Sequence, residues 1–453
     1  MLRGIREAAE RTPPQRERYV DLLRAVAITA VVLGHWLVVN VTYDGAGDLD
    51  GYSALGELTW SHPLTWLFQV MPLFFLVGGY ANGASWDSHR RRGIDAAGWL
   101  LTRGNRLLIP TTGLIVLAAV AAPVARLAGA DEDVTETGVW LVAIPLWFLT
   151  AYLAVVVLTP ILHPLHRRAG WAVIAVLVGA VAVTDAAELL LGVPHVTLVN
   201  YLLAWLAVHQ VGFAWRDGML DDRRVAVFTA GGGLVALVLL TVPGPYPISM
   251  VTVPGEEAQN TAPPTLALLA LAACWIGGAL LLRDRAARWL AGLRPWTVVV
   301  AVNSVVLTVF LWHMAAVVIA AVVLYPAGVL PQPPVDSVDW LLWRVPWLLC
   351  LAVVLAPLVA VFGGVERYAR RVGATPSRGD DGGRDHDGKS APDGGTVATV
   401  ATCLALAAAI AGLLGITTAG ATGAGPTGIP GWALALYLVG AGRLWLVALV
   451  RAR

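Results

Sequence analysis

The chain has 453 residues, of which 57% are hydrophobic and 13% charged, and its mean hydropathy is +0.70. An ordinary soluble domain carries about 25% charged residues, so this composition excludes a soluble fold and predicts a polytopic membrane protein. The net charge of +1 argues against a nucleic-acid partner, which needs a basic stripe or patch, and the three cysteines lack the spacing of a metal site or a disulfide framework.

Twelve apolar segments are long enough to cross a bilayer, since a spanning helix needs about 20 mostly apolar residues. We expect ten of them at residues 20–42, 64–85, 106–128, 139–162, 171–192, 197–215, 224–242, 264–282, 297–324 and 338–362. Two more are expected at residues 397–419 and 429–450.

The segments divide into ten and two. Between the tenth and eleventh spans lies a polar stretch rich in Gly, Asp, Ser and Pro, a composition that cannot bury a core. We therefore expect an all-α fold with a ten-span unit over residues 1–365, a disordered cytoplasmic linker over 366–396 and a two-span extension over 397–453.

Arginine placement predicts the orientation of the spans. Arginines cluster in alternate loops, while the intervening loops carry Asp and Glu with Arg126 as their only cation. The positive-inside rule therefore places both termini in the cytoplasm. Lys389 is the only lysine among 31 basic residues, a bias that indicates a GC-rich bacterial genome, so we expect a multi-pass protein of the inner (plasma) membrane.

Several ionisable side chains fall inside the expected spans, where a charge costs about 2.5–3.5 kcal/mol on insertion scales. Residues of this kind are functional candidates by default. They are His35, Asp185, Glu188, His209, His313, Arg344 and Arg443.

Arg24 and His35 lie eleven residues apart in the run RYVDLLRAVAITAVVLGHW. Eleven residues make about three helical turns and span about 16 Å, so both side chains project from one face of the first span. Arginine suits a phosphate at the mouth of a span, and a neutral imidazole deeper inside can act as a base. The alternative is a histidine that only packs against a neighbouring carbonyl.

His313, in the run VFLWHMAAV, adds a second imidazole near the middle of the ninth expected span. Two midspan histidines and an arginine at the mouth predict a polar cavity. Asp185 and Glu188 stand near the outer end of the fifth span, where they either bind an external substrate or are solvated at the interface.

For the remaining ionisable candidates we expect structural roles. We expect His209 to snorkel toward the nearby end of its span. For Arg344 and Arg443 we expect structural roles, such as a pair with a carboxylate of another helix.

The segment before the third span reads SHRRRGIDAAGWLLTRGNRLLIP. Arg103 and Arg106 stand at i and i+3 and share one face if a helix has begun there. From spacing alone, the two arginines fit a binding site and an ordinary positive-inside cluster equally well.

Five segments together resemble the acyltransferase 3 family of membrane-bound acyltransferases. They are Arg24 with His35 in the first span, MPLFFLVGGY in the second, RGNRLLIP at the third, PLWFLTAYL in the fourth and FLWHM in the ninth. The resemblance covers residues 16–365. One position departs from the family, which often has a serine where this chain has Gly78, and this indicates a divergent subgroup.

The resemblance implies transfer of an acyl group, commonly acetyl, from a cytoplasmic acyl-CoA to a hydroxyl of a carbohydrate or small molecule. His35 matches the family's essential histidine, and His313 is the second catalytic candidate. Arg24, Arg103 and Arg106 match arginines expected at the donor. Acyl-CoA is then a substrate, and neither a permanently bound cofactor nor a metal is expected.

The two midspan histidines fit this acyl-transfer reaction. His35 would remove the hydroxyl proton of the acceptor, or carry the acyl group in a covalent relay. His313 would orient His35, hold the acceptor or stabilise the oxyanion.

A twelve-span secondary transporter or flippase is the alternative function, because midspan histidines also serve as proton relays. The ten-plus-two division and the lack of a repeat between two halves argue against it. A third alternative is a non-catalytic membrane scaffold. It would gain nothing from burying two histidines, which costs free energy.

Overall fold

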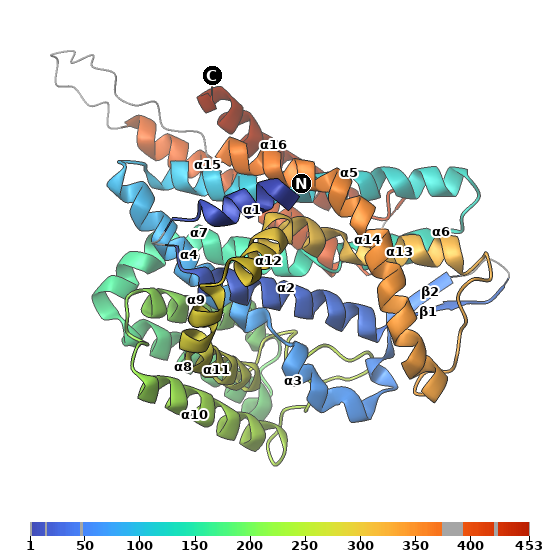
Figure 1. Ribbon diagram of the computed structural model, residues 1–453, viewed down its shortest axis with the longest axis horizontal. Coiled ribbons are helices and arrows are strands. Elements are labelled where there is room, and N and C mark those ends of the chain that lie inside the picture. The colour runs from blue at the N-terminus through green and yellow to red at the C-terminus, as the bar shows by residue number, and fades with distance from the viewer. Residues whose placement is uncertain (1, 14–15, 46–48, 374–392, 421–424, 453) are drawn as a thin grey trace.

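The computed structural model describes residues 2–13, 16–45, 49–373, 393–420 and 425–452 and shows a bundle of long helices (Figure 1). Within these residues, twelve helical segments are long and apolar enough to cross a membrane. Ten of them end by Val372 and two follow Ala398. The expected all-α polytopic fold, with ten spans followed by two, is therefore confirmed.

Helices make up most of the described chain. In chain order, the elements are α1 (Leu2–Glu10), α2 (Arg18–Val38), β1 (Val39–Tyr43), β2 (Leu49–Ser53), α3 (Thr65–Phe68), α4 (Met71–Arg91), α5 (Ala96–Leu127), α6 (Glu132–Ala143), α7 (Leu146–Ala169), α8 (Trp171–Leu191), α9 (Asn200–Arg216), α10 (Arg223–Thr241), α11 (Leu266–Leu290), α12 (Leu293–Ser304), α13 (Val306–Leu324), α14 (Val338–Gly373), α15 (Asp393–Thr418) and α16 (Gly431–Ala452). Short 3₁₀ turns occur at Ala54–Gly56, Thr59–Leu64 and Val196–Val199.

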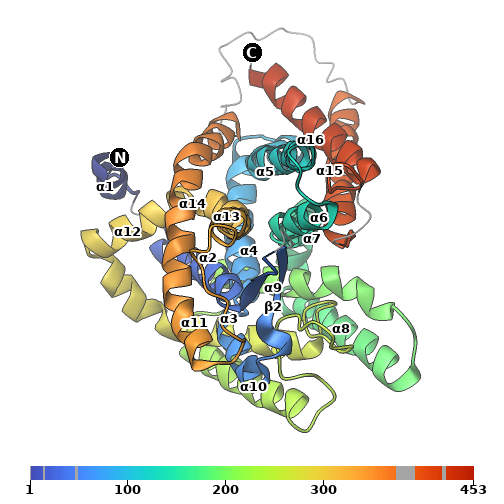
Figure 2. The ribbon, with the colours of Figure 1, turned by 90° about the vertical axis from the view of Figure 1, so that its right-hand side faces the viewer.

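Helices α2 and α4 lie in the interior of the bundle, as the view in Figure 2 shows. Helix α4 packs against α2, α7, α9 and α11, and α2 also packs against α12, α13 and α14. The pair α10 and α11 lies at one edge of the bundle, and the pair α15 and α16 at another (Figure 2). The helix that carries Arg24 and His35 is thus surrounded by other spans.

Helices α4 and α9 cross closely because two glycines meet there. A Cβ on Gly79 would lie 2.0 Å from the His209 carbonyl oxygen, and one on Gly212 would lie 2.2 Å from the Leu76 carbonyl oxygen. Small residues let membrane helices approach one another in this way. Gly79 of the second-span motif therefore serves helix packing.

The first span is shorter than expected. Helix α2 ends at Val38, whereas the sequence predicts a span to residue 42. The run Val39–Tyr43 is rich in β-branched residues, and it pairs with Leu49–Ser53 as an antiparallel hairpin.

The ninth expected span, 297–324, is not one helix. Helix α12 ends at Ser304 and α13 begins at Val306. The break falls where Asn303 and Ser304 interrupt an apolar run, and the side chains of such residues compete with helical hydrogen bonds.

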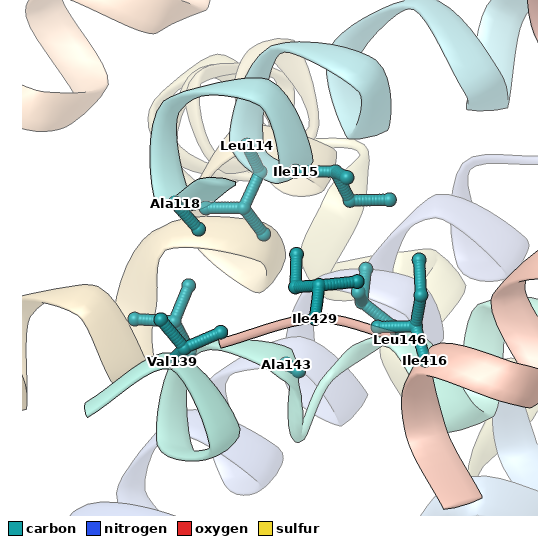
Figure 3. Close-up of a pocket in the computed structure, with 9 residues that line it drawn as sticks. Leu114, Ile115, Ala118, Val139, Ala143, Leu146, Ile416 and Ile429 are labelled. Carbon is teal, nitrogen blue, oxygen red and sulfur yellow. The ribbon is translucent and has the colours of Figure 1, made fainter. Parts of the chain in front are cut away.

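The two-helix extension packs onto α5 and α7. The Asn105 side chain on α5 donates from Nδ2 to the Leu444 carbonyl oxygen over 3.2 Å. An apolar crevice lies at the same contact, where Ile416 of α15 and residues such as Leu114 and Leu146 form an entirely apolar lining (Figure 3). Helices α15 and α16 therefore support the helix that bears Arg103 and Arg106.

The expected linker, 366–396, falls largely outside the described residues. Its first part, 366–373, continues helix α14, and the chain is described again from Asp393, where α15 begins.

Replacing Gly79 by alanine tests the close crossing of α4 and α9. The new Cβ would meet a backbone carbonyl, so the two helices must separate. We expect Gly79→Ala to lower the free energy of unfolding by about 1–3 kcal/mol, as overpacking does. Thermal unfolding of the purified protein in detergent measures this.

Gly113→Ala is the matched control, because a Cβ on Gly113 in α5 has no neighbour within 4 Å. It should leave stability unchanged or raise it by up to about 1 kcal/mol. Equal unfolding midpoints for the two variants would contradict the close crossing.

Candidate active site

His35 and His313 meet inside the bundle. Nδ1 of His35 on α2 lies 2.8 Å from Nε2 of His313 on α13, and the two rings are nearly parallel, at an angle of 8°. The Trp36 indole joins the same two helices, because its Nε1 donates to the His313 carbonyl oxygen over 2.9 Å. Two candidates that stand 278 residues apart in the sequence are direct neighbours.

The surroundings of His313 determine which nitrogens of the neutral rings carry hydrogen. Nδ1 of His313 lies 2.6 Å from the Phe310 carbonyl oxygen, which can only accept, so this nitrogen is the donor. Nε2 of a neutral His313 is then an acceptor, and Nδ1 of His35 donates to it. His35 is left with an unprotonated Nε2 whose lone pair can accept a proton.

Of the two rings, His35 is the accessible one. His35 is partly exposed to solvent. His313 is 0% exposed. Of the two imidazoles, His35 is therefore the one that a substrate can reach.

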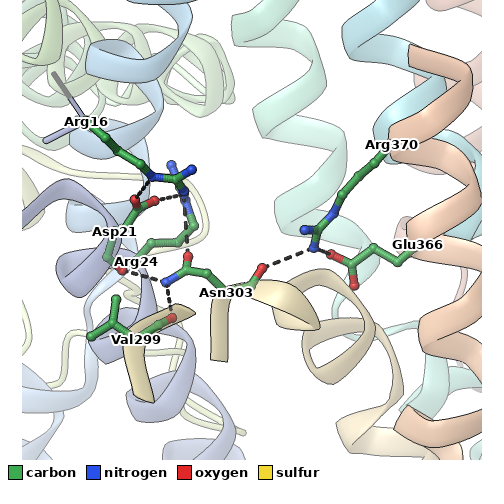
Figure 4. Close-up of polar contacts among 7 residues, drawn as sticks. All are labelled: Arg16, Asp21, Arg24, Val299, Asn303, Glu366 and Arg370. Carbon is green, nitrogen blue, oxygen red and sulfur yellow. Dashed lines mark hydrogen bonds and ion pairs between the residues drawn. The ribbon is translucent and has the colours of Figure 1, made fainter. Parts of the chain in front are cut away.

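At the other end of the α2 stripe, Arg24 is held by Asp21 and Asn303. Its Nη1 donates to Asp21 Oδ1 over 2.9 Å and lies 3.5 Å from Asn303 Oδ1. Asp21 is 5% exposed and also accepts from Arg16 Nε over 2.6 Å. One carboxylate is thus shared by two guanidinium groups, and the cluster keeps a net positive charge (Figure 4).

Arg103 and Arg106 lie within a helix, because α5 begins at Ala96 and not near residue 106. The Asp95 side chain caps this start by accepting from the Gly98 backbone N–H over 2.8 Å. Arg103 donates from Nη2 to the Ala81 carbonyl oxygen of α4 over 3.2 Å.

The arginines of three helices form one positive cluster. Arg106 lies within electrostatic range of Arg24 and Arg103, and also of Arg370 on α14. Arg106 is exposed to solvent. Like charges held together repel one another, and a bound anion relieves that repulsion. The three arginines predicted at the donor end are therefore close together around accessible surface.

Tyr152 of α7 covers the position where the family often has a serine. A Cβ on Gly78 would lie 2.7 Å from the Tyr152 ring and 3.1 Å from its hydroxyl. Tyr152 is also within electrostatic range of Arg103 and Arg106. The phenol thus brings a hydroxyl close to the place that a serine would occupy.

Asp185 has a structural role. Its Oδ1 accepts from Asn200 Nδ2 over 2.9 Å, and its Oδ2 accepts from the Tyr246 hydroxyl and the Leu266 backbone N–H, each over 2.8 Å. These bonds tie α8 to α9 and to the start of α11. Glu188, one turn further along α8, is exposed and accepts a hydrogen bond from the Thr197 hydroxyl.

The expectation that His209 snorkels is wrong. Its side chain is 0% exposed, and its Nε2 lies 3.1 Å from Asn82 Nδ2. The ring packs on Phe213, which also contacts His163, whose Nε2 lies 3.7 Å from Asp87 Oδ1. This second polar cluster is spread over α4, α7 and α9, so no local sequence pattern indicates it.

Arg344 has the structural role that we expect, with different partners. Its guanidinium lies 4.0 Å from the centroid of the Trp340 ring and donates to the Val39 carbonyl oxygen over 3.0 Å. It therefore joins α14 to the hairpin through the Val39 carbonyl, while the ring that it covers belongs to α14 itself. Arg443 is exposed on α16.

The fold and the site define a polytopic helical membrane protein with a paired-histidine centre and a positive cluster. The family model described as an acyltransferase domain matches residues 17–363, more than half of the chain. The protein therefore belongs to the acyltransferase 3 family, and this membership decides against the transporter. No curated protein and no solved structure matches the chain.

Replacing His313 by alanine tests the histidine pair. The variant removes the acceptor of the His35 Nδ1 hydrogen, so His35 is no longer held with an unprotonated Nε2. We expect kcat of acyl transfer to fall by about 10- to 100-fold, less than the loss of a general base, with little change in the KM of the donor. Initial rates at varied donor concentration measure both constants.

Trp36→Phe is the control, because it removes the bond to the His313 carbonyl and leaves both imidazoles in place. Its kcat should stay near that of the wild type. An unchanged kcat in His313→Ala would show that the pair does not take part in the reaction.

Proposed function

We propose that this acyltransferase moves an acyl group, in the simplest case acetyl, from acyl-CoA to a hydroxyl of a carbohydrate or small molecule, with His35 as general base. The hydrogen bond between His35 and His313 carries the proposal, because it leaves an acceptor nitrogen on the accessible ring. Family membership supports acyl transfer in general.

The reaction balances with one base. Nε2 of His35 takes the hydroxyl proton of the acceptor while the hydroxyl oxygen attacks the thioester carbonyl carbon, and a C–O bond forms. The tetrahedral intermediate then collapses as the C–S bond breaks. The departing thiolate takes the proton from His35, so the products are an ester and free CoA, and the imidazole is neutral again.

His313 acts as a positioning residue in this scheme. The Phe310 carbonyl oxygen holds its Nδ1 hydrogen and thereby directs the Nε2 lone pair at His35. When His35 becomes an imidazolium, the same hydrogen bond is charge-assisted and stabilises the new charge.

The arginine cluster is the proposed site for the phosphates of the donor. Guanidinium groups bind phosphate in a bidentate manner, and Arg106 is exposed within the cluster. Arg24 and His35 share one face of α2 and stand about 16 Å apart along its axis. The long, thin pantetheine arm suits this stripe, with the phosphates at Arg24 and the thioester at His35.

The donor then comes from the cytoplasm, because the arginine-bearing loops lie at this end of the spans and the positive-inside rule places them there. An acceptor on the opposite side of the membrane would reach His35 through the bundle.

His35→Ala tests the proposal. Radiolabelled acetyl-CoA is supplied to the purified protein in lipid vesicles, with a membrane extract of the producing cells as the source of acceptor, and released CoA is measured. We expect the rate to fall by about 10²–10⁴-fold while CoA binding is retained, because a base contributes mainly in the transition state.

His195→Asn is the control. His195 is exposed and has a left-handed backbone with φ of 60°, which asparagine tolerates, so its rate should equal that of the wild type. If His35→Ala keeps more than about a tenth of the wild-type rate, His35 is not the base.

A further inference from the structure

One ion pair on α14 supports the break between α12 and α13. Arg370 Nη2 donates to the carbonyl oxygens of Asn303 over 3.1 Å and Ser304 over 2.7 Å. Glu366, paired with Arg370, accepts from the Thr308 backbone N–H over 2.9 Å and from its hydroxyl over 2.7 Å. Helix ends leave carbonyl and N–H groups that lipid cannot satisfy, and this pair satisfies both sides of the break.

The same break places Asn303 between two arginines. Its side-chain Oδ1 faces Arg24, and its backbone carbonyl accepts from Arg370 (Figure 4). Its Nδ2 donates to the carbonyl oxygens of Asp21 and Val299, each over 2.9 Å, which keeps the residue in place. Arg24 and Arg370 are thus held at one residue although they come from the first and tenth spans.

Positive charge exceeds negative charge in this region. Arg370 has a carboxylate partner in Glu366, whereas Arg106 makes no ion pair within the part of the chain that the structure describes. Arg370 also has unused donors, since its Nε is buried without a hydrogen-bond partner among the described residues. A buried donor without a partner is costly, and an anion that entered the cluster would accept from it.

We propose that Arg370 is a fourth arginine of the donor site, where it binds a phosphate group of CoA together with Arg24 and Arg106. The inference rests on the proposed function, since it assumes a CoA donor. Arg370 lies beyond residues 17–363, the range of the family match. It therefore adds to the donor site a residue of the segment that follows the family domain.

Binding of CoA to the purified protein, measured by titration calorimetry, tests this assignment. Arg370→Gln should raise the Kd of CoA by about 10- to 100-fold, the effect of losing a charge-assisted hydrogen bond. Arg370→Lys should recover binding only in part, because an ammonium cannot bind phosphate in a bidentate manner. Arg371→Gln is the control, since Arg371 is the exposed neighbour on α14, and its Kd should match that of the wild type.

A phosphate-free donor separates binding from support of the helix break. Arg370→Gln also removes the partner of Glu366 and of the carbonyls at the break, and turnover of S-acetylpantetheine measures that loss alone. This turnover should fall less in Arg370→Gln than CoA binding does. If this turnover falls in parallel with CoA binding, Arg370 only supports the break, and an unchanged Kd of CoA also overturns the inference. If the wild-type protein does not bind CoA, the proposed donor itself is wrong, and that result differs from every outcome that concerns Arg370 alone.

Discussion

The hydrogen bond between His35 and His313 is the contact on which the arrangement of the site depends. Polar rings in an apolar bundle require partners, and here each ring satisfies the other while the Phe310 carbonyl oxygen accepts from Nδ1 of His313. This fixes α2 against α13. Because α2 also carries Arg24, the contact that directs the base sets the position of the donor end as well.

Four polar residues of this bundle differ in how much of their hydrogen-bonding capacity is used. Asp185 accepts three hydrogen bonds and Glu366 accepts two beside its ion pair, so both are satisfied and join helices. His35 and Arg106 are accessible to solvent and keep unused capacity, which is a lone pair on His35 and, on Arg106, a charge without an ion pair among the described residues. Among these four residues, the two carboxylates that are satisfied join helices, and the two groups with unused capacity are the accessible ones.

Helical period and polar residues in apolar runs are sufficient to predict the spans and to select Arg24, His35 and His313 as candidates. They could not predict that the two histidines touch, because that contact depends on how α2 and α13 pack. The break at Asn303 is marked only by two polar residues in an otherwise apolar run. The sequence does not predict a place for Arg370 at the site, because the tenth span is expected to end at residue 362, whereas α14 continues to Gly373.

A structure of the protein bound to CoA tests the central claim most directly, because the claim is that one ligand extends from the arginine cluster to the histidine pair. Density for the phosphates should lie among Arg24, Arg103 and Arg106, and the sulfur end of the pantetheine arm should lie beside Nε2 of His35. CoA bound elsewhere, or bound at the arginines with its sulfur directed away from His35, would contradict the account.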